Sequence, residues 1–302
     1  MANASGLKHN GIMSLKFAVI GEKGQLARAL KVQIEAQSYD AVFFNRTSLD
    51  LSASPHIILK FMDKLEQVDA VILAAAYTAV DDAENNQDIA MAINGRAPGV
   101  IAQACHKRGI PLIHFSTDYV FNGKAVAPYE ITETPDPINF YGVSKREGEL
   151  NIQASQCQHT ILRTSWVFDG TGKNFLTTML RLAETRPSLN IVSDQLGRPT
   201  YAGHLAQAGL SAARSLIAGN QESVGIFHVS NIGSIISWAD FAEAIFCNES
   251  LAVTVNPIPS SEYPTRATRP AFSALSTKKF ESMFDYKLPS WQEGLKAALK
   301  ER

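Results

Sequence analysis

The chain alternates short, continuously apolar runs with longer stretches in which apolar residues recur every three to four positions. The short runs are typical of strands buried on both faces, and the longer period is typical of amphipathic helices. This alternation predicts an α/β fold with a doubly wound parallel sheet, whose strands all end at one edge where a ligand would bind. The expected strands are 15–20, 41–44, 70–75, 111–115 and 160–163, and the expected helices are 25–36, 57–65, 89–107 and 141–154.

The regular alternation weakens after about residue 165. Helices are expected at 174–184, 203–216, 237–246 and 291–300, and extended segments at 190–192, 225–229 and 253–258, with Ser237 as a helix cap. We therefore expect a Rossmann domain over 14–165, to which about 188–196 adds another sheet strand. Residues 166–302 would form most of a smaller, mixed α/β substrate-binding lobe that is intertwined with the first domain, and 1–12 a flexible extension.

Composition narrows the possible partners of the protein. The 302 residues carry a net charge of −1, which gives no general attraction to nucleic acid or to an anionic membrane. The longest apolar run, 68–80, is interrupted by Asp69 and is too short to span a bilayer. The three cysteines have no metal-ligand spacing, so no metal site is predicted and a reduced, cytoplasmic setting is the simplest interpretation.

A glycine-containing loop follows the first expected strand. Gly21 permits a tight turn, and Gly24 permits close approach of the backbone to a pyrophosphate at the helix start, beside Gln25 and Leu26. The pattern indicates a dinucleotide site, although a plain glycine turn is the alternative.

The end of the second strand bears on the type of dinucleotide. Asn45 is not the acidic residue that grips a ribose 2′-hydroxyl, and Arg46 suits a 2′-phosphate. We therefore expect NADPH, with NADH possible, while a solvated surface arginine is the alternative. Small residues after the third strand would also let the backbone approach the dinucleotide, although tight helix–sheet packing explains them equally well. The further candidates for cofactor contact are Asp50, Leu51, Ala74, Ala75, Ala76, Tyr77 and Thr78.

Tyr141 and Lys145 are four residues apart on an expected helix and so share one face. A nearby ammonium favours the phenolate, so we expect Lys145 to lower the pKa of Tyr141. A hydroxyl of Ser116 or Thr117 at the end of the fourth strand would hold a substrate oxygen. Together these groups predict carbonyl or alcohol redox chemistry, although this spacing alone is common.

Several segments narrow the prediction further. The sequence resembles the dTDP-4-dehydrorhamnose reductases, a group of extended short-chain dehydrogenases/reductases, from about residue 15 to 300. The glycine loop and the Tyr141–Lys145 pair belong to the whole superfamily. The other matching segments are AAAYTAVDDAE (74–84), STDYVF (116–121), RTSWV (163–167), DQLGRPT (194–200) and YPTRATRP (263–270). Of these, STDYVF, RTSWV and the DQxGxPT pattern narrow the resemblance to this reductase group.

The resemblance implies roles for individual residues. Tyr141 would protonate the 4-keto oxygen of a dTDP-4-dehydro-L-rhamnose substrate, Lys145 would also bind the nicotinamide ribose, and Thr117 would hold the carbonyl. Asp118 and Trp166 would contact the sugar nucleotide, with Arg269 a candidate for its diphosphate. Phe115 stands where tyrosine is common and Tyr77 where histidine is common, so local contacts with the cofactor would differ there. The residues that match cofactor-contacting positions are Gly24, Gln25, Leu26, Ala76, Tyr77 and Thr78.

Some alternatives stay open. Residues 116–118 would equally serve to cap a strand end, Trp166 would fit a core aromatic, and Arg269 would fit a solvated side chain. The resemblance also implies a possible homodimer, in which some members bridge subunits through magnesium. Ala29 stands where those members have a glutamate, so magnesium is doubtful here.

Two other functions fit the same motifs. The first is a related nucleotide-sugar 4-keto reductase or epimerase acting on another sugar or base. The second is a non-catalytic, NADP-binding regulatory subunit that resembles the methionine adenosyltransferase β-subunit. The presence of Thr117, Tyr141 and Lys145 argues against the second without excluding it.

Overall fold

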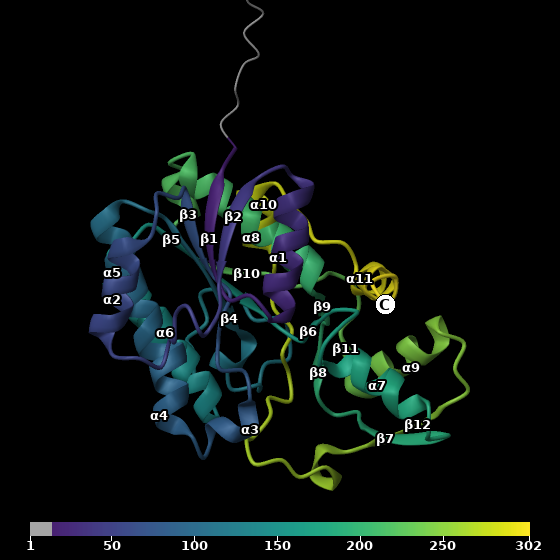
Figure 1. Cartoon of the computed structure of the whole chain (residues 1–302). Helices are drawn as coiled ribbons and strands as arrows, with labels where there is room; N and C mark the ends of the chain where they lie inside the picture. Colours follow the sequence, from purple (N-terminus) through teal and green to yellow (C-terminus); the bar gives the residue numbers. More distant parts are fainter. Residues whose placement is uncertain (1–13) are drawn as a thin grey trace, which may run out of the picture.

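A six-stranded sheet, parallel throughout, forms the centre of the protein (Figure 1). The computed structural model describes residues 14–302, so the expected extension at 1–12 lies outside the described residues. The strand order is β10-β5-β4-β3-β1-β2, and it confirms the predicted doubly wound sheet. The strands are β1 (Lys16–Ile20), β2 (Asp40–Phe44), β3 (Ala70–Leu73), β4 (Leu112–Thr117), β5 (His159–Thr164) and β10 (Gly225–His228).

Helices cover both faces of this sheet (Figure 1). Alternate residues of β1 point to opposite faces: Phe17 and Val19 join one apolar cluster, and Ala18 and Ile20 join the other. On the Phe17 side lie α1 (Gln25–Ala36), α8 (Ala202–Ile217) and α10 (Lys278–Phe284). On the Ala18 side lie α2 (Pro55–Lys64), α5 (Ala97–Arg108) and α6 (Phe140–Ala154).

The helix expected over 89–107 is interrupted by a wider turn. After α3 (Val80–Ala83), helical structure runs through α4 (Gln87–Ala90), the π-helical turn η1 (Met91–Arg96) and α5. The apolar pattern of the sequence did not indicate the π turn. No helix within residues 14–302 is both long and apolar enough to cross a membrane.

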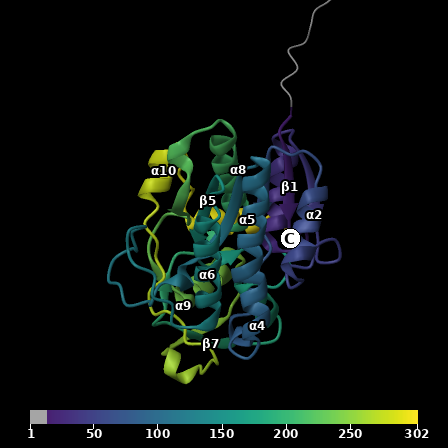
Figure 2. The ribbon, with the colours of Figure 1, turned by 90° about the vertical axis from the view of Figure 1, so that its left-hand side faces the viewer.

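The smaller lobe lies beyond one end of the sheet, where α9 (Trp238–Asn248) and β7 (Ser188–Val192) are seen in both views (Figures 1 and 2). Its core joins residues from three helices and the short strands. Ser237 caps α9 as expected, because its hydroxyl accepts a bond from the Asp240 N–H. The elements are β6 (Val167–Phe168), α7 (Phe175–Ala183), β7 (Ser188–Val192), β8 (Leu196–Gly197), β9 (Thr200–Tyr201), β11 (Ile236–Ser237), α9 (Trp238–Asn248), β12 (Thr254–Ile258) and α11 (Trp291–Leu299).

One expected strand lies in a different sheet. The prediction that 188–196 extends the Rossmann sheet is wrong, because β7 pairs with β12 in a separate two-stranded sheet. Leu189 and Ile191 are buried while Ser188 and Asn190 are exposed, a pattern that suits a sheet with one solvated face. The sixth strand of the main sheet is β10, which follows α8. The chain after residue 165 therefore contributes both to the central sheet and to the smaller lobe.

Candidate active site

A cavity of about 470 Å³ lies at the carboxyl ends of β1 and β3, where the strand order reverses. Such a reversal is the usual ligand site of a doubly wound sheet. Most of the predicted cofactor residues line it, together with the predicted catalytic pair. These residues are Gly21, Gly24, Gln25, Leu26, Ala74, Ala75, Ala76, Thr78, Phe115, Tyr141 and Lys145.

The glycine loop forms one wall of the cavity. Gly21 has a φ of +120°, and a Cβ there would lie 3.1 Å from the Ala75 nitrogen, so a side chain would be strained. A Cβ at Gly24 would meet nothing within 4 Å, which leaves room for a ligand. The first turn of α1 carries no acidic side chain, and the buried Gln25 Oε1 has no partner among the described residues. The free N–H groups of this helix start therefore suit an anion.

Three cationic side chains, Lys23, Arg28 and Lys173, also line the cavity. Arg28 donates to the Lys23 carbonyl at 2.6 Å and to the Asp169 carboxylate at 2.7 Å. It also donates to the Thr171 carbonyl at 3.2 Å, so it ties the loop 169–174 to α1. This loop brings Lys173 to the cavity, a position that no motif in the sequence indicated.

Tyr141 and Lys145 lie on α6, whose start is fixed by close packing. Asn139 caps the helix by accepting a bond from Gly142 N–H at 2.8 Å. A Cβ at Gly142 would lie 2.1 Å from the Tyr119 carbonyl oxygen, so only glycine allows this approach. The Lys145 ammonium donates to the Phe115 carbonyl at 2.7 Å and lies 3.1 Å from His114 Nε2.

The pKa of Tyr141 differs from the expectation. Burial raises this pKa above its usual value, the neighbouring Asp118 raises it further, and Thr117 opposes the shift. The predicted lowering of this pKa by Lys145 is therefore wrong, because the Lys145 ammonium is bound to β4 instead. Burial lowers the pKa of Lys145 to about 8, and Glu149 opposes that shift.

Thr117 and Asp118 lie at the end of β4, beside Tyr141. The Thr117 hydroxyl donates to Asp118 Oδ1 at 3.0 Å and accepts from the Tyr119 N–H at 3.2 Å, so it does cap the turn η2 (Asp118–Val120). Asp118 Oδ2 is buried, and no donor among the described residues meets it in hydrogen-bond geometry, although the Ser273 hydroxyl lies close enough to act on the carboxyl group. Burial raises the pKa of this carboxyl to about 6, although Ser273 and Thr117 lower it. An unpaired carboxylate oxygen here can accept a bond from a ligand hydroxyl.

A buried ion pair lies behind this strand end. Glu149 on α6 accepts from Arg163 at 2.8 and 2.7 Å, from Arg146 at 2.9 Å and from Ser116 at 2.6 Å. Hydrogen bonding to these donors holds the pKa of Glu149 below its usual value despite its burial. Ser116 therefore supports the network, and Thr117 is the hydroxyl beside Tyr141.

Other predicted cofactor residues do not line the cavity. Asn45 donates to Glu22 Oε2 at 2.7 Å, and the Arg46 side chain is 78% exposed and 3.4 Å from Asp50. Leu51 is buried in the apolar cluster beneath the sheet. Their contact with a dinucleotide stays a prediction.

Tyr77 also lies off the cavity, where its backbone is bound by the side chain of Asn94 in the π turn. That amide accepts from Tyr77 N–H at 2.8 Å and donates to the Tyr77 carbonyl at 2.9 Å. It also donates to the Ser144 hydroxyl at 3.0 Å. Asn94 thus connects the loop after β3 to the helix that carries Tyr141 and Lys145.

The predicted sugar-nucleotide residues Trp166 and Arg269 have partners within the protein. Trp166 has a φ of +48°, and its ring stacks on Trp238 with centroids 3.6 Å apart. Arg269 pairs with Asp81 at 2.6 Å, with 19% of its side chain exposed, so it is not a freely solvated arginine. Substrate contact by either residue stays a prediction.

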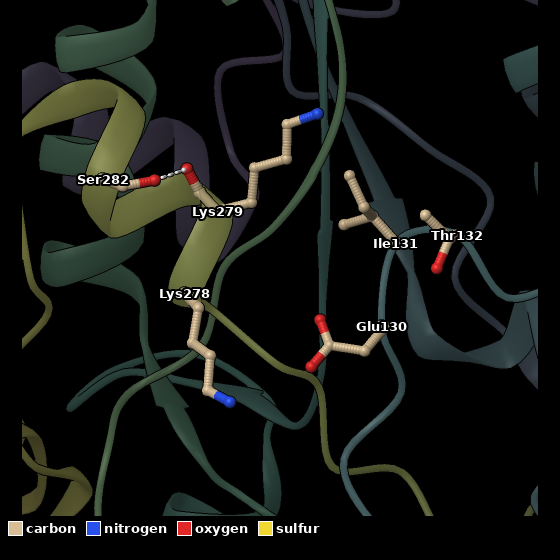
Figure 3. A pocket seen from close by; sticks show the side chains of 6 residues that line it. All are labelled: Glu130, Ile131, Thr132, Lys278, Lys279 and Ser282. Carbon is tan, nitrogen blue, oxygen red and sulfur yellow. Dashed lines mark hydrogen bonds between the residues drawn. The ribbon is translucent and has the colours of Figure 1, made fainter.

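A second hollow of about 560 Å³ lies on another part of the surface, between α10 and the segment 130–132 (Figure 3). Its lining shares no residue with the first cavity, and the two lysine side chains point in different directions (Figure 3). The lining residues of the hollow are Glu130, Ile131, Thr132, Lys278, Lys279 and Ser282.

Within residues 14–302, no group of three or more His, Cys, Asp or Glu side chains is placed to hold a metal ion.

Comparison with known proteins decides the family. The family model described as the RmlD substrate binding domain matches residues 15–302. The chain belongs to this family. A dTDP-4-dehydrorhamnose reductase of Sinorhizobium fredii is 40% identical over 284 residues, covering 92% of this chain and 95% of the relative. One of Salmonella typhimurium is 41% identical over 239 residues, covering 77% and 79%. These matches confirm the resemblance to the dTDP-4-dehydrorhamnose reductases that the sequence motifs of this RmlD-family chain indicated.

Solved structures agree with the family. A dTDP-4-dehydrorhamnose reductase of Bacillus anthracis in complex with NADP superposes with a TM-score of 0.87 at 33% identity, covering 96% of this chain and all of the other. A UDP-glucose 4-epimerase of Thermus thermophilus in complex with NAD has a TM-score of 0.78 at 18% identity, covering 95% of this chain and 98% of the other. The second likeness shows a shared fold only.

Proposed function

We propose that this protein reduces dTDP-4-dehydro-β-L-rhamnose to dTDP-L-rhamnose with NADPH, the last step of dTDP-rhamnose biosynthesis. The observation that carries the proposal is that Tyr141 and Lys145 line the cavity, with Thr117 beside Tyr141, in a chain of this family. Relatives that bear the reductase name match most of the chain, and one related structure contains NADP.

The lining of the cavity suits the diphosphate of a dinucleotide. The open space at Gly24 and the unpaired N–H groups of α1 suit its diphosphate, and Lys23, Arg28 and Lys173 supply positive charge. Arg46 would meet a 2′-phosphate outside this cavity. When bound, the reduced nicotinamide supplies a hydride to the sugar carbon.

The side chains then account for the proton and for orientation. Tyr141 donates the proton that converts the C4 oxygen into a hydroxyl, and Thr117 holds that oxygen while charge develops on it. Held by Phe115 and His114, the Lys145 ammonium has a third N–H that would bind the nicotinamide ribose, and its positive charge favours the phenolate that is left on Tyr141. Asp118 Oδ2 accepts a bond from a sugar hydroxyl, and Trp166 contacts the sugar nucleotide.

The nucleotide-sugar specificity is the part to test. Purified protein is mixed with NADPH and, in turn, with 4-keto sugars linked to dTDP, UDP and GDP, while the absorbance of NADPH is followed. We expect oxidation with dTDP-4-dehydro-L-rhamnose and at least tenfold slower turnover with the others. Turnover of a UDP- or GDP-linked sugar alone would instead indicate a related reductase. With its three cysteines free in the structure, we also propose a cytoplasmic setting.

A further inference from the structure

His114 lies directly beneath the catalytic lysine. It comes from β4, is 1% exposed, and its Nε2 lies 3.1 Å from the Lys145 ammonium. The same ammonium donates to the carbonyl of Phe115, the next residue of β4, at 2.7 Å. Two neighbouring acceptors of one strand therefore hold it.

The chemistry of the pair fixes the state of the imidazole. An ammonium has only donors, so Nε2 must accept and the ring proton must sit on Nδ1. Burial lowers the pKa of His114 well below its usual value, and the Lys145 charge lowers it further, so the ring is neutral. His159 on β5 acts in the same direction, and Glu149 on α6 favours the charged form of Lys145.

Packing alone does not account for a histidine here. Nδ1 is buried with no hydrogen-bond partner among the described residues, and an unpaired buried donor is destabilising. An apolar side chain would fill the same space without that cost. The compensating gain is the contact with Lys145.

We propose that His114 is a positioning residue, whose Nε2 anchors the Lys145 ammonium on β4 and leaves its third N–H for a partner in the cavity. Because β4 also ends in Thr117, the anchor fixes the ammonium relative to the substrate-holding hydroxyl. This inference rests on the proposed reductase function, and it adds a residue that touches neither substrate nor cofactor.

A near-isosteric pair of variants separates the anchor from packing. His114→Gln keeps a strong acceptor, and His114→Met fills similar space with only a weak one. We expect kcat of His114→Gln within about threefold of wild type, and kcat of His114→Met at least about tenfold below His114→Gln, with the sugar-nucleotide KM changed less than twofold. His159→Phe is the matched control, because that buried histidine contacts the Cys157 carbonyl and not Lys145. It should keep wild-type kcat.

Thermal melting of each variant completes the test. Equal kcat values for the Gln and Met variants would overturn the proposal. It would also be overturned if His114→Gln folded but neither His114→Met nor His114→Phe did, because His114 would then have a structural role. If wild type reduced no 4-keto sugar, the proposed function would fail separately. The anchor would then be tested by NADPH titration, where we expect His114→Met to bind about fivefold more weakly than His114→Gln, and equal affinities would refute it.

Discussion

The buried carboxyl of Asp118 makes the stability of the unliganded protein depend on pH. The perturbation is Asp118→Asn, which keeps an oxygen for the Thr117 hydroxyl and cannot ionise. Asp118 Oδ2 is buried without a partner among the described residues, and burial raises the carboxyl pKa from 3.8 to about 6. The native state therefore retains a proton that the unfolded chain has lost between these two values.

The size of the change in stability with pH follows from the shift in the pKa of Asp118. Because the folded-state pKa is raised, ionisation destabilises the native state progressively as the pH rises from about 4 to about 6. The full cost above pH 7 is about 3 kcal/mol, of which about half is already present at pH 5. The free energy of unfolding of wild type, relative to Asp118→Asn, should thus fall by about 1.5 kcal/mol between pH 5 and pH 8.

Urea unfolding of both proteins at pH 5 and pH 8 measures this difference. The other titrating groups are common to both proteins, so their contributions largely cancel when the two are compared at each pH. A difference between the proteins that is the same at both pH values would refute the reasoning. It would mean that the carboxylate has found a hydrogen-bond donor in solution.

Three further changes test separate parts of the site. Arg46→Ala should raise the KM for NADPH about fivefold and leave that for NADH nearly unchanged, because only NADPH carries the 2′-phosphate; equal effects in initial-rate assays would contradict this. Lys173→Ala should raise the KM for both cofactors, more at low salt than at high salt, and a KM that is independent of salt would count against diphosphate contact. Glu149→Gln should lower the free energy of unfolding by about 3–5 kcal/mol, because it leaves the Arg163 charge buried without a partner; a loss below about 1 kcal/mol in urea unfolding would disprove that account.

The sequence predicted the central sheet and the glycine turn beside the cavity well, because their signals are local. Continuous apolar runs marked β1 to β5, and Gly21 and Gly24 marked the turn between β1 and α1. The segment 188–192 misled the prediction because a short apolar run does not reveal its pairing partner. Only the tertiary structure shows that β12 lies beside it.

Contacts between distant segments could not be predicted in the same way. The loop that carries Lys173 reaches the cavity through the Arg28–Asp169 ion pair, which joins residues 141 positions apart. In the sequence, His114 is simply one residue of a buried strand, and only the structure shows that Lys145 contacts it. The pKa of Tyr141 was predicted from spacing along one helix, whereas burial and Asp118 decide it.

The central claim is that Tyr141 delivers the proton to the C4 oxygen of the sugar. Its most direct test is the rate of NADPH oxidation by wild type and by Tyr141→Phe with dTDP-4-dehydro-L-rhamnose, with equal melting temperatures as the control for folding. We predict that wild type oxidises NADPH only when the sugar nucleotide is present, and that Tyr141→Phe loses about 10²–10⁴-fold in kcat. Near-normal turnover by a folded Tyr141→Phe would contradict the account.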